Sequence, residues 1–274
     1  MTILDRIVED TRSLVARRKQ TVTVRSLEER PCTNAPTLSL EQALRRDTLA
    51  ILAELKKASP SRGVIRADYD VTELAHQYKT GGAAAVSVLT EPTHFNGSLD
   101  HLAQVRQTID LPLLRKDFII DPYQLLEARA YGADAVLLIA TVLDRSQLFD
   151  LHQAADELGL SCLVEIYDPS ELDKIDFDQV TILGVNNRDL RTFEVDINRS
   201  LRVFEAVPEG VVRVSESGLR TAKDLAHLRR NGVDAVLIGE TFMRATYPGQ
   251  TLAAMKEDVY TLLRPESSSI RVAS

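Results

Sequence analysis

Charged and amide side chains stand at the ends of several short apolar segments of the sequence. Glu54 and Lys56 end TLAILAELK, Lys116 ends LPLLRK, Glu165 lies near the end of SCLVEI, and Asn186 ends VTILGVN. Carboxylates and amines can transfer protons during a reaction. One such residue alone is usually a solvated strand end or half of an ion pair. Five of the eight strands that the sequence predicts end in Lys, Glu or Asn, and this joint pattern favours acid–base chemistry if the ends meet.

Two glycine-bearing turns follow the last two predicted strands. The first is SESGL at 215–219, with Ser217 and Gly218, and the second is IGETF at 238–242, with Gly239. Tight turns often need glycine for conformational reasons alone. In a barrel of alternating strands and helices, however, the turns after strands seven and eight often bind a phosphate through backbone N–H groups. Their joint occurrence favours a phosphate site.

A repeated glycine junction indicates the elements that must position these residues. It occurs in GGAAAVSVL from Gly81, GADAVLLI from Gly132 and GVDAVLIG from Gly232. Glycine is expected to end a helix there, and the apolar run that follows suits a parallel strand covered on both faces. The separations of 50 residues from Gly82 to Gly132 and 100 from Gly132 to Gly232 fit a strand–helix unit of about 25 residues. Eight strands are predicted, near 48–56, 83–90, 111–116, 135–140, 161–166, 180–186, 211–216 and 235–239.

The alternation of strands and helices predicts an α/β fold, a (β/α)8 TIM barrel with an N-terminal helical extension. An open doubly wound sheet is the alternative, but ELKKASPSRG after the first strand lacks the G-x-G-x-x-G pattern of dinucleotide-binding sheets. Leu4, Ile7, Val8 and Val15 lie near one side of a predicted N-terminal helix. The predicted organisation is an extension over 1–47 that packs on the barrel, a catalytic barrel over 48–265 and a tail over 266–274.

Side-chain alternation assigns directions to the strand ends. Glu54 and Lys56 share one face of their strand, whereas Lys116 lies between two charged neighbours, Arg115 and Asp117, in LLRKDFIID. We expect Lys116 to point into the barrel mouth. Arg115 and Asp117 then point to the opposite side, where structural ion pairs are expected.

Composition excludes several classes of partner. The 274-residue chain is 44% hydrophobic and carries a net charge of −7, and it has no long basic run for a nucleic-acid surface. No segment approaches the roughly 20 apolar residues that cross a bilayer. Cys32 and Cys162 have no disulfide or metal spacing and suggest reduced thiols in a cytoplasmic protein. The five histidines show no ligand spacing, so no metal site is expected.

Eight segments now suggest a family, because the chain resembles indole-3-glycerol phosphate synthase of tryptophan biosynthesis. They are AELKKASPSRG, SVLTEPTHFNGSL, LLRKDFIIDPYQ, GADAVLLI, LVEIYD, GVNNRDL, VSESGL and LIGETFM. RKDFIIDPYQ and GVNNRDL together are the most specific, whereas SESG and LIG occur in many phosphate-binding barrels. The resemblance implies a carboxy-lyase that converts 1-(2-carboxyphenylamino)-1-deoxyribulose 5-phosphate to indole-3-glycerol phosphate, with loss of CO₂ and water.

The resemblance also implies residue roles. Lys116 would donate a proton to the substrate carbonyl, with its pKa lowered by desolvation or by a neighbouring cation such as Lys56. Glu165 would stabilise the developing cation on the aromatic amine or remove a proton, and Glu54 and Lys56 would serve the dehydration. The implied catalytic residues are Lys116, Glu165, Lys56, Glu54 and Asn186.

The implied substrate-binding residues divide by the part of the substrate that they contact. The resemblance implies that Ser59, Ser217, Gly218 and Gly239 bind the phosphate. It implies that Asn186 and Glu216 contact the sugar. Arg188 suits the anthranilate carboxylate through its planar fork. The implied apolar wall around the aromatic ring consists of Pro60, Phe95, Phe118 and Leu137. Leu237 lies near Gly239 on the last predicted strand.

Glu240 departs from family members that carry serine there. By alternation its side chain is expected to point away from the ligand, which leaves only its backbone N–H for the phosphate. No cofactor is implied, and the expected state is a monomer or weak homodimer with one phosphorylated small-molecule substrate. The alternatives are another sugar-phosphate barrel, such as phosphoribosylanthranilate isomerase, and a non-catalytic barrel that binds phosphate.

Overall fold

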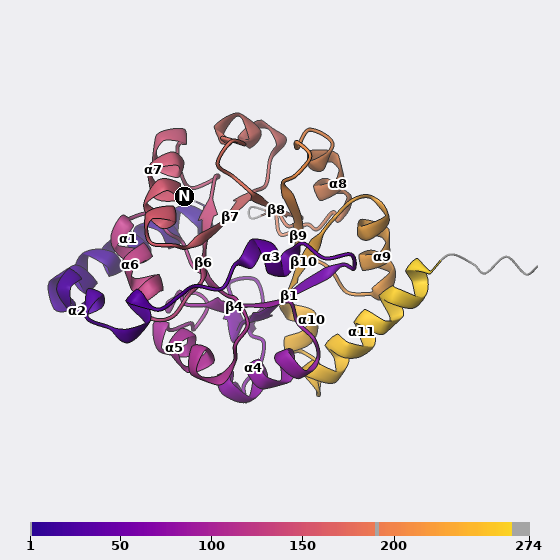
Figure 1. The fold of residues 1–274 in the computed structure, drawn as a ribbon, viewed down its shortest axis with the longest axis horizontal. Coiled ribbons are helices and arrows are strands. Elements are labelled where there is room, and N and C mark those ends of the chain that lie inside the picture. Colours follow the sequence, from indigo (N-terminus) through magenta and orange to yellow (C-terminus); the bar gives the residue numbers. More distant parts are fainter. Residues whose placement is uncertain (1, 190–191, 265–274) are drawn as a thin grey trace, which may run out of the picture.

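The centre of the computed structural model, which describes residues 2–189 and 192–264, is a closed barrel of parallel strands (Figure 1). Strand β1 pairs with β4 on one side and with β10 on the other, which closes the ring. The predicted (β/α)8 barrel is therefore confirmed, and the open sheet is excluded. The barrel strands are β1 (Ala50–Leu55), β4 (Ala85–Leu89), β5 (Leu113–Lys116), β6 (Ala135–Ile139), β7 (Ser161–Ile166), β8 (Ile182–Asn186), β9 (Val212–Glu216) and β10 (Ala235–Ile238).

Helices surround the barrel and cover the outer face of its strands (Figure 1). Each predicted strand lies within two residues of an observed one. The predicted helix-ending glycines are also confirmed, because Gly82, Gly132 and Gly232 have φ values of +86°, +88° and +82°. The helices after β1 are α4 (Val71–Thr80), α5 (Leu99–Thr108), α6 (Pro122–Ala130), α7 (Arg145–Glu157), the 3₁₀ helix η2 (Pro169–Lys174), α8 (Asn198–Phe204), α9 (Ala222–Arg230), α10 (Glu240–Met243) and α11 (Pro248–Leu263).

A short antiparallel hairpin after β1 was not expected from the sequence. It consists of β2 (Ala58–Ser59) and β3 (Gly63–Val64). Two-residue strands have almost no periodic signal, so the segment SPSRG does not reveal them. The hairpin matters for the site because it carries Ser59 and Pro60.

The N-terminal segment forms α1 (Ile3–Thr21), α2 (Val24–Glu28), the 3₁₀ helix η1 (Pro31–Asn34) and α3 (Leu40–Leu44). Helix α1 begins with a capping box, in which Thr2 and Asp5 exchange hydrogen bonds between side chain and backbone. Its other end is held to the barrel by ion pairs from Arg18 to Glu127 at 3.3 Å and from Lys19 to Asp121 at 2.7 Å. The division of the chain at residue 47 stays a prediction, and the proposed tail over 266–274 lies outside the described residues.

Helix α3 covers the barrel opening from which the strands start (Figure 1). Leu40 and Leu44 are fully buried and join the apolar cluster inside the barrel, which includes Leu52, Leu114 and Leu163. A second, larger cluster fills the space between the strands and the outer helices. With one opening filled by leucine side chains, the barrel interior is accessible from the opposite end, where the strands finish.

None of the helices within residues 2–189 and 192–264 is long and apolar enough to cross a membrane.

Replacing Leu44 by Ala should lower the free energy of unfolding by about 2–5 kcal/mol, because it leaves a cavity in the barrel interior. Urea unfolding measures the loss. The control is Gln42→Ala on the exposed side of the same helix, which should change stability by less than about 0.5 kcal/mol. Equal stability of the two variants would show that α3 does not support the barrel.

Candidate active site

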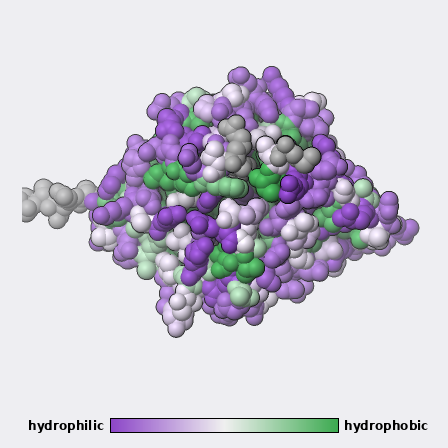
Figure 2. Space-filling model, turned by 180° about the vertical axis from the view of Figure 1, so that it is seen from behind, coloured by the Kyte–Doolittle hydropathy of each residue, from purple (hydrophilic) through white to green (hydrophobic). Residues whose placement is uncertain are grey.

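The ends of the barrel strands open into a cavity of about 440 Å³. Figure 2 shows this face of the molecule, with apolar residues gathered around a hollow near its centre. Every residue that the sequence predicted for the site lines the cavity. They are Glu54, Lys56, Ser59, Pro60, Phe95, Lys116, Phe118, Leu137, Glu165, Asn186, Arg188, Glu216, Ser217, Gly218, Leu237, Gly239 and Glu240.

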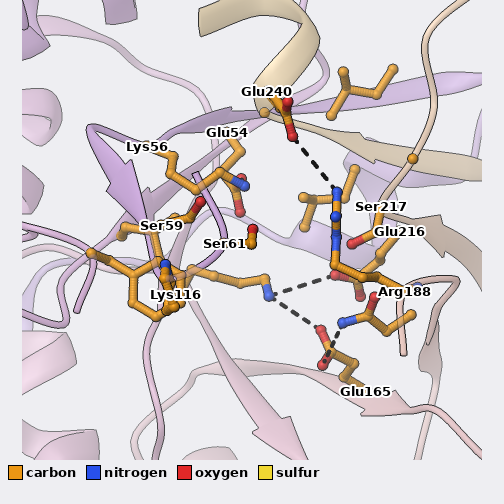
Figure 3. Close-up of a pocket in the computed structure, with 18 of the residues that line it drawn as sticks. Glu54, Lys56, Ser59, Ser61, Lys116, Glu165, Arg188, Glu216, Ser217 and Glu240 are labelled. Carbon is orange, nitrogen blue, oxygen red and sulfur yellow. Dashed lines mark hydrogen bonds and ion pairs between the residues drawn. The ribbon is translucent and has the colours of Figure 1, made fainter. Parts of the chain in front are cut away.

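Lys116 lies among carboxylates at the centre of the cavity (Figure 3). Its Nζ is 3.2 Å from Oε2 of Glu165 and 3.7 Å from Oε2 of Glu216. Asn186 donates a hydrogen bond of 3.3 Å from Nδ2 to Oε1 of Glu165. Strands β7 and β9 therefore hold the carboxylate partners of a lysine at the end of β5, and Asn186 at the end of β8 orients one of them. These contacts fix the ammonium group where a substrate would enter.

The electrostatic surroundings of Lys116 differ from those expected. Burial alone would lower its pKa, but the charges of Glu165, Glu216 and Glu54 and the hydrogen bond that Lys116 donates to Glu165 outweigh burial and raise the pKa above the ordinary lysine value. The expected lowering of the pKa by Lys56 is therefore wrong. The reason is that Lys56 forms its own ion pair with Glu54, whereas carboxylates surround Lys116.

Glu216 is the most protected acid of this group, with 1% of its surface exposed. Burial raises its pKa well above the ordinary glutamate value, and repulsion from Glu165 acts in the same direction, although attraction to Lys116 opposes it. Two carboxylates that share one ammonium cannot both ionise without cost. Among these carboxylates, Glu216 is thus the one whose protonated form is favoured by its burial.

Two glycines make room for the buried acids. A Cβ atom at Gly184 would clash with the carboxylate of Glu216, and one at Gly239 would clash with that of Glu54. The barrel wall must lack side chains at these points because the acids occupy that space. Alternation along β8 places Gly184 on the same face as Asn186, but a residue pattern does not show the space that the glycine provides.

Arg115 and Asp117 point away from Lys116, as alternation predicted, and the expected structural pairing is confirmed. The guanidinium of Arg115 is fully buried, and its Nη2 lies 2.9 Å from Asp117 Oδ2 and 3.2 Å from Glu127 Oε2. Asp117 also accepts a hydrogen bond from Thr90. The network fixes the end of β5 from behind, while Lys116 faces the cavity.

The turn after β9 has a backbone suited to an anion. Ser217 and Gly218 have consecutive positive φ values of +70° and +79°, and a turn of this kind can present backbone N–H groups to a phosphate. Asn187 supports the turn, because its buried side chain donates hydrogen bonds to the hydroxyl of Ser215 at 2.9 Å and to the carbonyl of Ser217 at 3.3 Å. Sequence reasoning missed Asn187, although it lies in the motif GVNNRDL.

Glu240 does not point away from the cavity, and that expectation is wrong. Strand alternation stops at Ile238, and Glu240 is the first residue of helix α10 after its N-cap, Gly239. The helical turn places the Glu240 carboxylate at the cavity, with Oε2 3.6 Å from Nη2 of Arg188 (Figure 3).

An apolar wall lines one side of the cavity. The rings of Phe95 and Phe118 are tilted by 38°, with their centroids 6.1 Å apart. The first turns of α1 add Ile3, Leu4 and Ile7. The sequence indicated an amphipathic helix but not that its apolar side reaches the cavity, because a hydrophobic pattern does not say which surface it covers.

The loop that carries Phe95 is fixed from both sides. The carboxylate of Glu91 accepts backbone hydrogen bonds from residues 93–95, and the His94 ring lies 2.9 Å from Asp10 of α1. These contacts connect the barrel loop that carries Phe95 to helix α1 of the N-terminal segment. The helix and the loop therefore present one continuous apolar surface.

The fold and the cavity together define a class, a (β/α)8-barrel enzyme with an acid–base group at the carboxyl ends of its strands. The family model for indole-3-glycerol phosphate synthase matches residues 4–255. The chain belongs to that family, and the prediction made from its motifs is confirmed.

Two relatives illustrate the similarity. The chain is 58% identical to the indole-3-glycerol phosphate synthase of Salinibacter ruber, over 94% of this chain and 96% of that one. It is 47% identical to the enzyme of that name from Rhodopirellula baltica, over 89% of this chain and 95% of that one. Among solved structures, 3-hexulose-6-phosphate synthase from Salmonella typhimurium is similar with a TM-score of 0.62 and 15% identity, over 78% of this chain and 98% of that one. That last likeness supports the fold alone.

Replacing Arg115 by Met should lower the free energy of unfolding by about 3–5 kcal/mol, because it leaves the buried carboxylates of Asp117 and Glu127 without their shared cation. Thermal or urea unfolding measures the loss. The matched control is Arg25→Met, whose exposed ion pair with Glu29 should contribute less than about 1 kcal/mol. A stable Arg115→Met variant would show that the network is not needed to hold β5.

Proposed function

We propose that this protein converts 1-(2-carboxyphenylamino)-1-deoxyribulose 5-phosphate to indole-3-glycerol phosphate, a carboxy-lyase step of tryptophan biosynthesis. Family membership over nearly the whole chain supports the reaction. The observation that carries the proposal is the ammonium of Lys116, held by Glu165 in a cavity with an apolar wall. A ring closure on a sugar carbonyl needs such a proton donor beside a surface that binds an aromatic ring.

The charges of the cavity suggest how the substrate lies. The phosphate binds the turns at Ser217, Gly218 and Gly239, together with Ser59 of the β2–β3 hairpin. The aromatic ring packs against Phe95 and Phe118. Arg188 then binds the aromatic carboxylate with its guanidinium fork. The sugar lies between these ends, within reach of the acid–base residues.

The remaining lining residues complete this arrangement. Asn186 and Glu216 contact the sugar hydroxyls, and Pro60, Leu137 and Leu237 extend the apolar wall. Glu240 contributes its backbone N–H to the phosphate site and its side chain to Arg188. Because all these residues belong to one chain, the site is complete in a monomer or in each half of a weak homodimer.

Lys116 begins the reaction by donating a proton to the carbonyl oxygen as the aromatic carbon attacks. Its raised pKa keeps it charged before the substrate binds, so the proton is always present. Proton transfer becomes favourable as negative charge develops on the oxygen, which makes that oxygen the stronger base. The high pKa thus secures the protonated state, and the substrate supplies the driving force.

Glu165 acts on the positive charge that the ring closure creates. The attack leaves a cation on the aromatic amine, and the carboxylate of Glu165 stabilises it. The C–C bond between the attacking aromatic carbon and its carboxylate then breaks, CO₂ leaves, and the electron pair of that bond returns to the ring and neutralises the cation. Its hydrogen bond from Asn186 keeps Glu165 oriented during this step.

Dehydration completes the indole ring. Lys56 and Glu54 form an ion pair on the opposite side of the cavity from Glu165, so they are placed to act as acid and base for the loss of water (Figure 3). The ring nitrogen and the departing carboxylate both belong to the substrate, and the chemistry therefore requires no cofactor. The cytoplasm is the proposed location.

A turnover assay tests the proposed function directly. The purified protein is incubated with the substrate, and the absorbance of the indole product is followed together with the release of CO₂. Formation of both in equal amounts supports the proposal. Binding of the substrate without either product would favour a non-catalytic barrel, and an Amadori rearrangement of phosphoribosylanthranilate would favour an isomerase.

Lys116→Met should lower kcat by about 10²- to 10⁴-fold, because it removes the proton donor but keeps the length of the side chain. Circular dichroism should show an intact fold. The matched control is Lys57→Met, since Lys57 does not line the cavity, and it should keep most of the activity. Near-wild-type turnover by a folded Lys116→Met enzyme would defeat the mechanism.

Arg188→Ala should raise KM by about 10- to 100-fold with a smaller effect on kcat. The charge-assisted contact with the substrate carboxylate contributes roughly 1.5–3 kcal/mol, and the ground state shares it with the transition state of ring closure. Steady-state kinetics separates the two effects. An unchanged KM would place the carboxylate elsewhere.

A further inference from the structure

Three arginines converge on the side chain of Glu240. Oε1 of Glu240 lies 3.1 Å from Nε of Arg244 and 3.4 Å from Nε of Arg62, and Oε2 lies 3.6 Å from Nη2 of Arg188. The arginines come from different segments: Arg244 follows α10, Arg62 lies in the turn of the β2–β3 hairpin, and Arg188 follows β8. Glu240 thus joins three segments around the mouth of the cavity.

The pair with Arg188 differs from the other two. The side chain of Arg188 is 18% exposed, against 43% for Arg62 and 53% for Arg244. It lines the cavity, and its contact with Glu240 is the longest of the three. A pair at 3.6 Å is beyond the usual length of a charge-assisted hydrogen bond, so another carboxylate can take it over at little cost. Glu240 would keep Arg62 and Arg244 after such an exchange.

We infer that Glu240 is a specificity-determining residue whose carboxylate occupies Arg188 in the empty site and gives it up to the aromatic carboxylate of the substrate. This inference rests on the proposed function. The two carboxylates are chemically equivalent to a guanidinium fork, and they compete for the same Nη atoms. The competition weakens substrate binding in proportion to the strength of the Arg188–Glu240 pair.

The exchange has a consequence after the chemical step. When the C–C bond to the carboxylate breaks and CO₂ leaves, the product no longer carries a group for Arg188. Glu240 can then pair with Arg188 again, since Arg62 and Arg244 hold it close by. Arg188 therefore contributes to the binding of the substrate, which carries the carboxylate. It contributes nothing to the binding of the product, which has lost the carboxylate.

Anthranilate, which carries the aromatic carboxylate but no phosphate, is the probe for the exchange. Isothermal titration measures its affinity for the wild-type protein and for Glu240→Gln, which keeps the size of the side chain but removes the competing charge. We expect binding about two- to fivefold tighter in the variant, the range of a partly exposed ion pair. In an Arg188→Gln background, Glu240→Gln should have no effect on anthranilate.

Two further measurements distinguish exchange from a general change in charge. Glu41→Gln makes the same charge change on α3, at the opposite end of the barrel, and should leave anthranilate binding unaltered. Inhibition by indole-3-glycerol phosphate, which carries the phosphate but no carboxylate, should also be unaltered in Glu240→Gln. Equal tightening of anthranilate and product would indicate simple attraction of anions and would overturn the inference.

Weaker anthranilate binding by Glu240→Gln would overturn it as well, because it would make Glu240 a support that positions Arg188. The titrations need no turnover. A wild-type protein that fails to form the indole product therefore counts against the proposed function, whereas the titrations decide separately whether Glu240 competes for Arg188.

Discussion

The site depends on one buried electrostatic interaction, that of the Lys116 ammonium with the carboxylates of Glu165 and Glu216. An isolated charge in this position would be expensive to remove from water. Paired charges reduce the cost, but only if their geometry is fixed. The closed barrel provides that geometry, because the ends of β5, β7 and β9 cannot move independently. The same interaction raises the pKa of Lys116, whereas burial and repulsion from Glu165 raise the pKa of Glu216 against the attraction of Lys116.

A second group of buried charges lies on the outer side of β5, opposite Lys116, and it supports the strand. Arg115, Asp117 and Glu127 satisfy one another on the outer side of β5, and Arg18 of α1 adds a partner to Glu127. Lys116 and Arg115, which are adjacent on β5, thus point to opposite faces, Lys116 into the cavity and Arg115 into this buried network. Through Arg18 the N-terminal segment contacts this support, and through the first turns of α1 it also contacts the cavity.

The mouth of the cavity is less tightly fixed than its floor. Arg62, Arg188 and Arg244 are partly exposed to different degrees, and each forms an ion pair with Glu240. Such pairs contribute little stability and can be exchanged. The structure therefore combines a buried group of charges at the bottom of the cavity with more exposed ion pairs at its entrance.

The sequence by itself determined the barrel fold and which residues line the cavity. Periodic glycine junctions and apolar runs located each strand, and strand alternation separated Lys116 from Arg115, because both signals are local. Tertiary structure decided what depends on neighbours distant in the chain. Lys116 meets carboxylates and not Lys56, the apolar side of α1 reaches the cavity, and Glu240 turns toward Arg188 because strand alternation ends where helix α10 begins. Charge environments and helix docking arise from pairwise distances in space, and a pattern of residue types along one chain does not contain those distances.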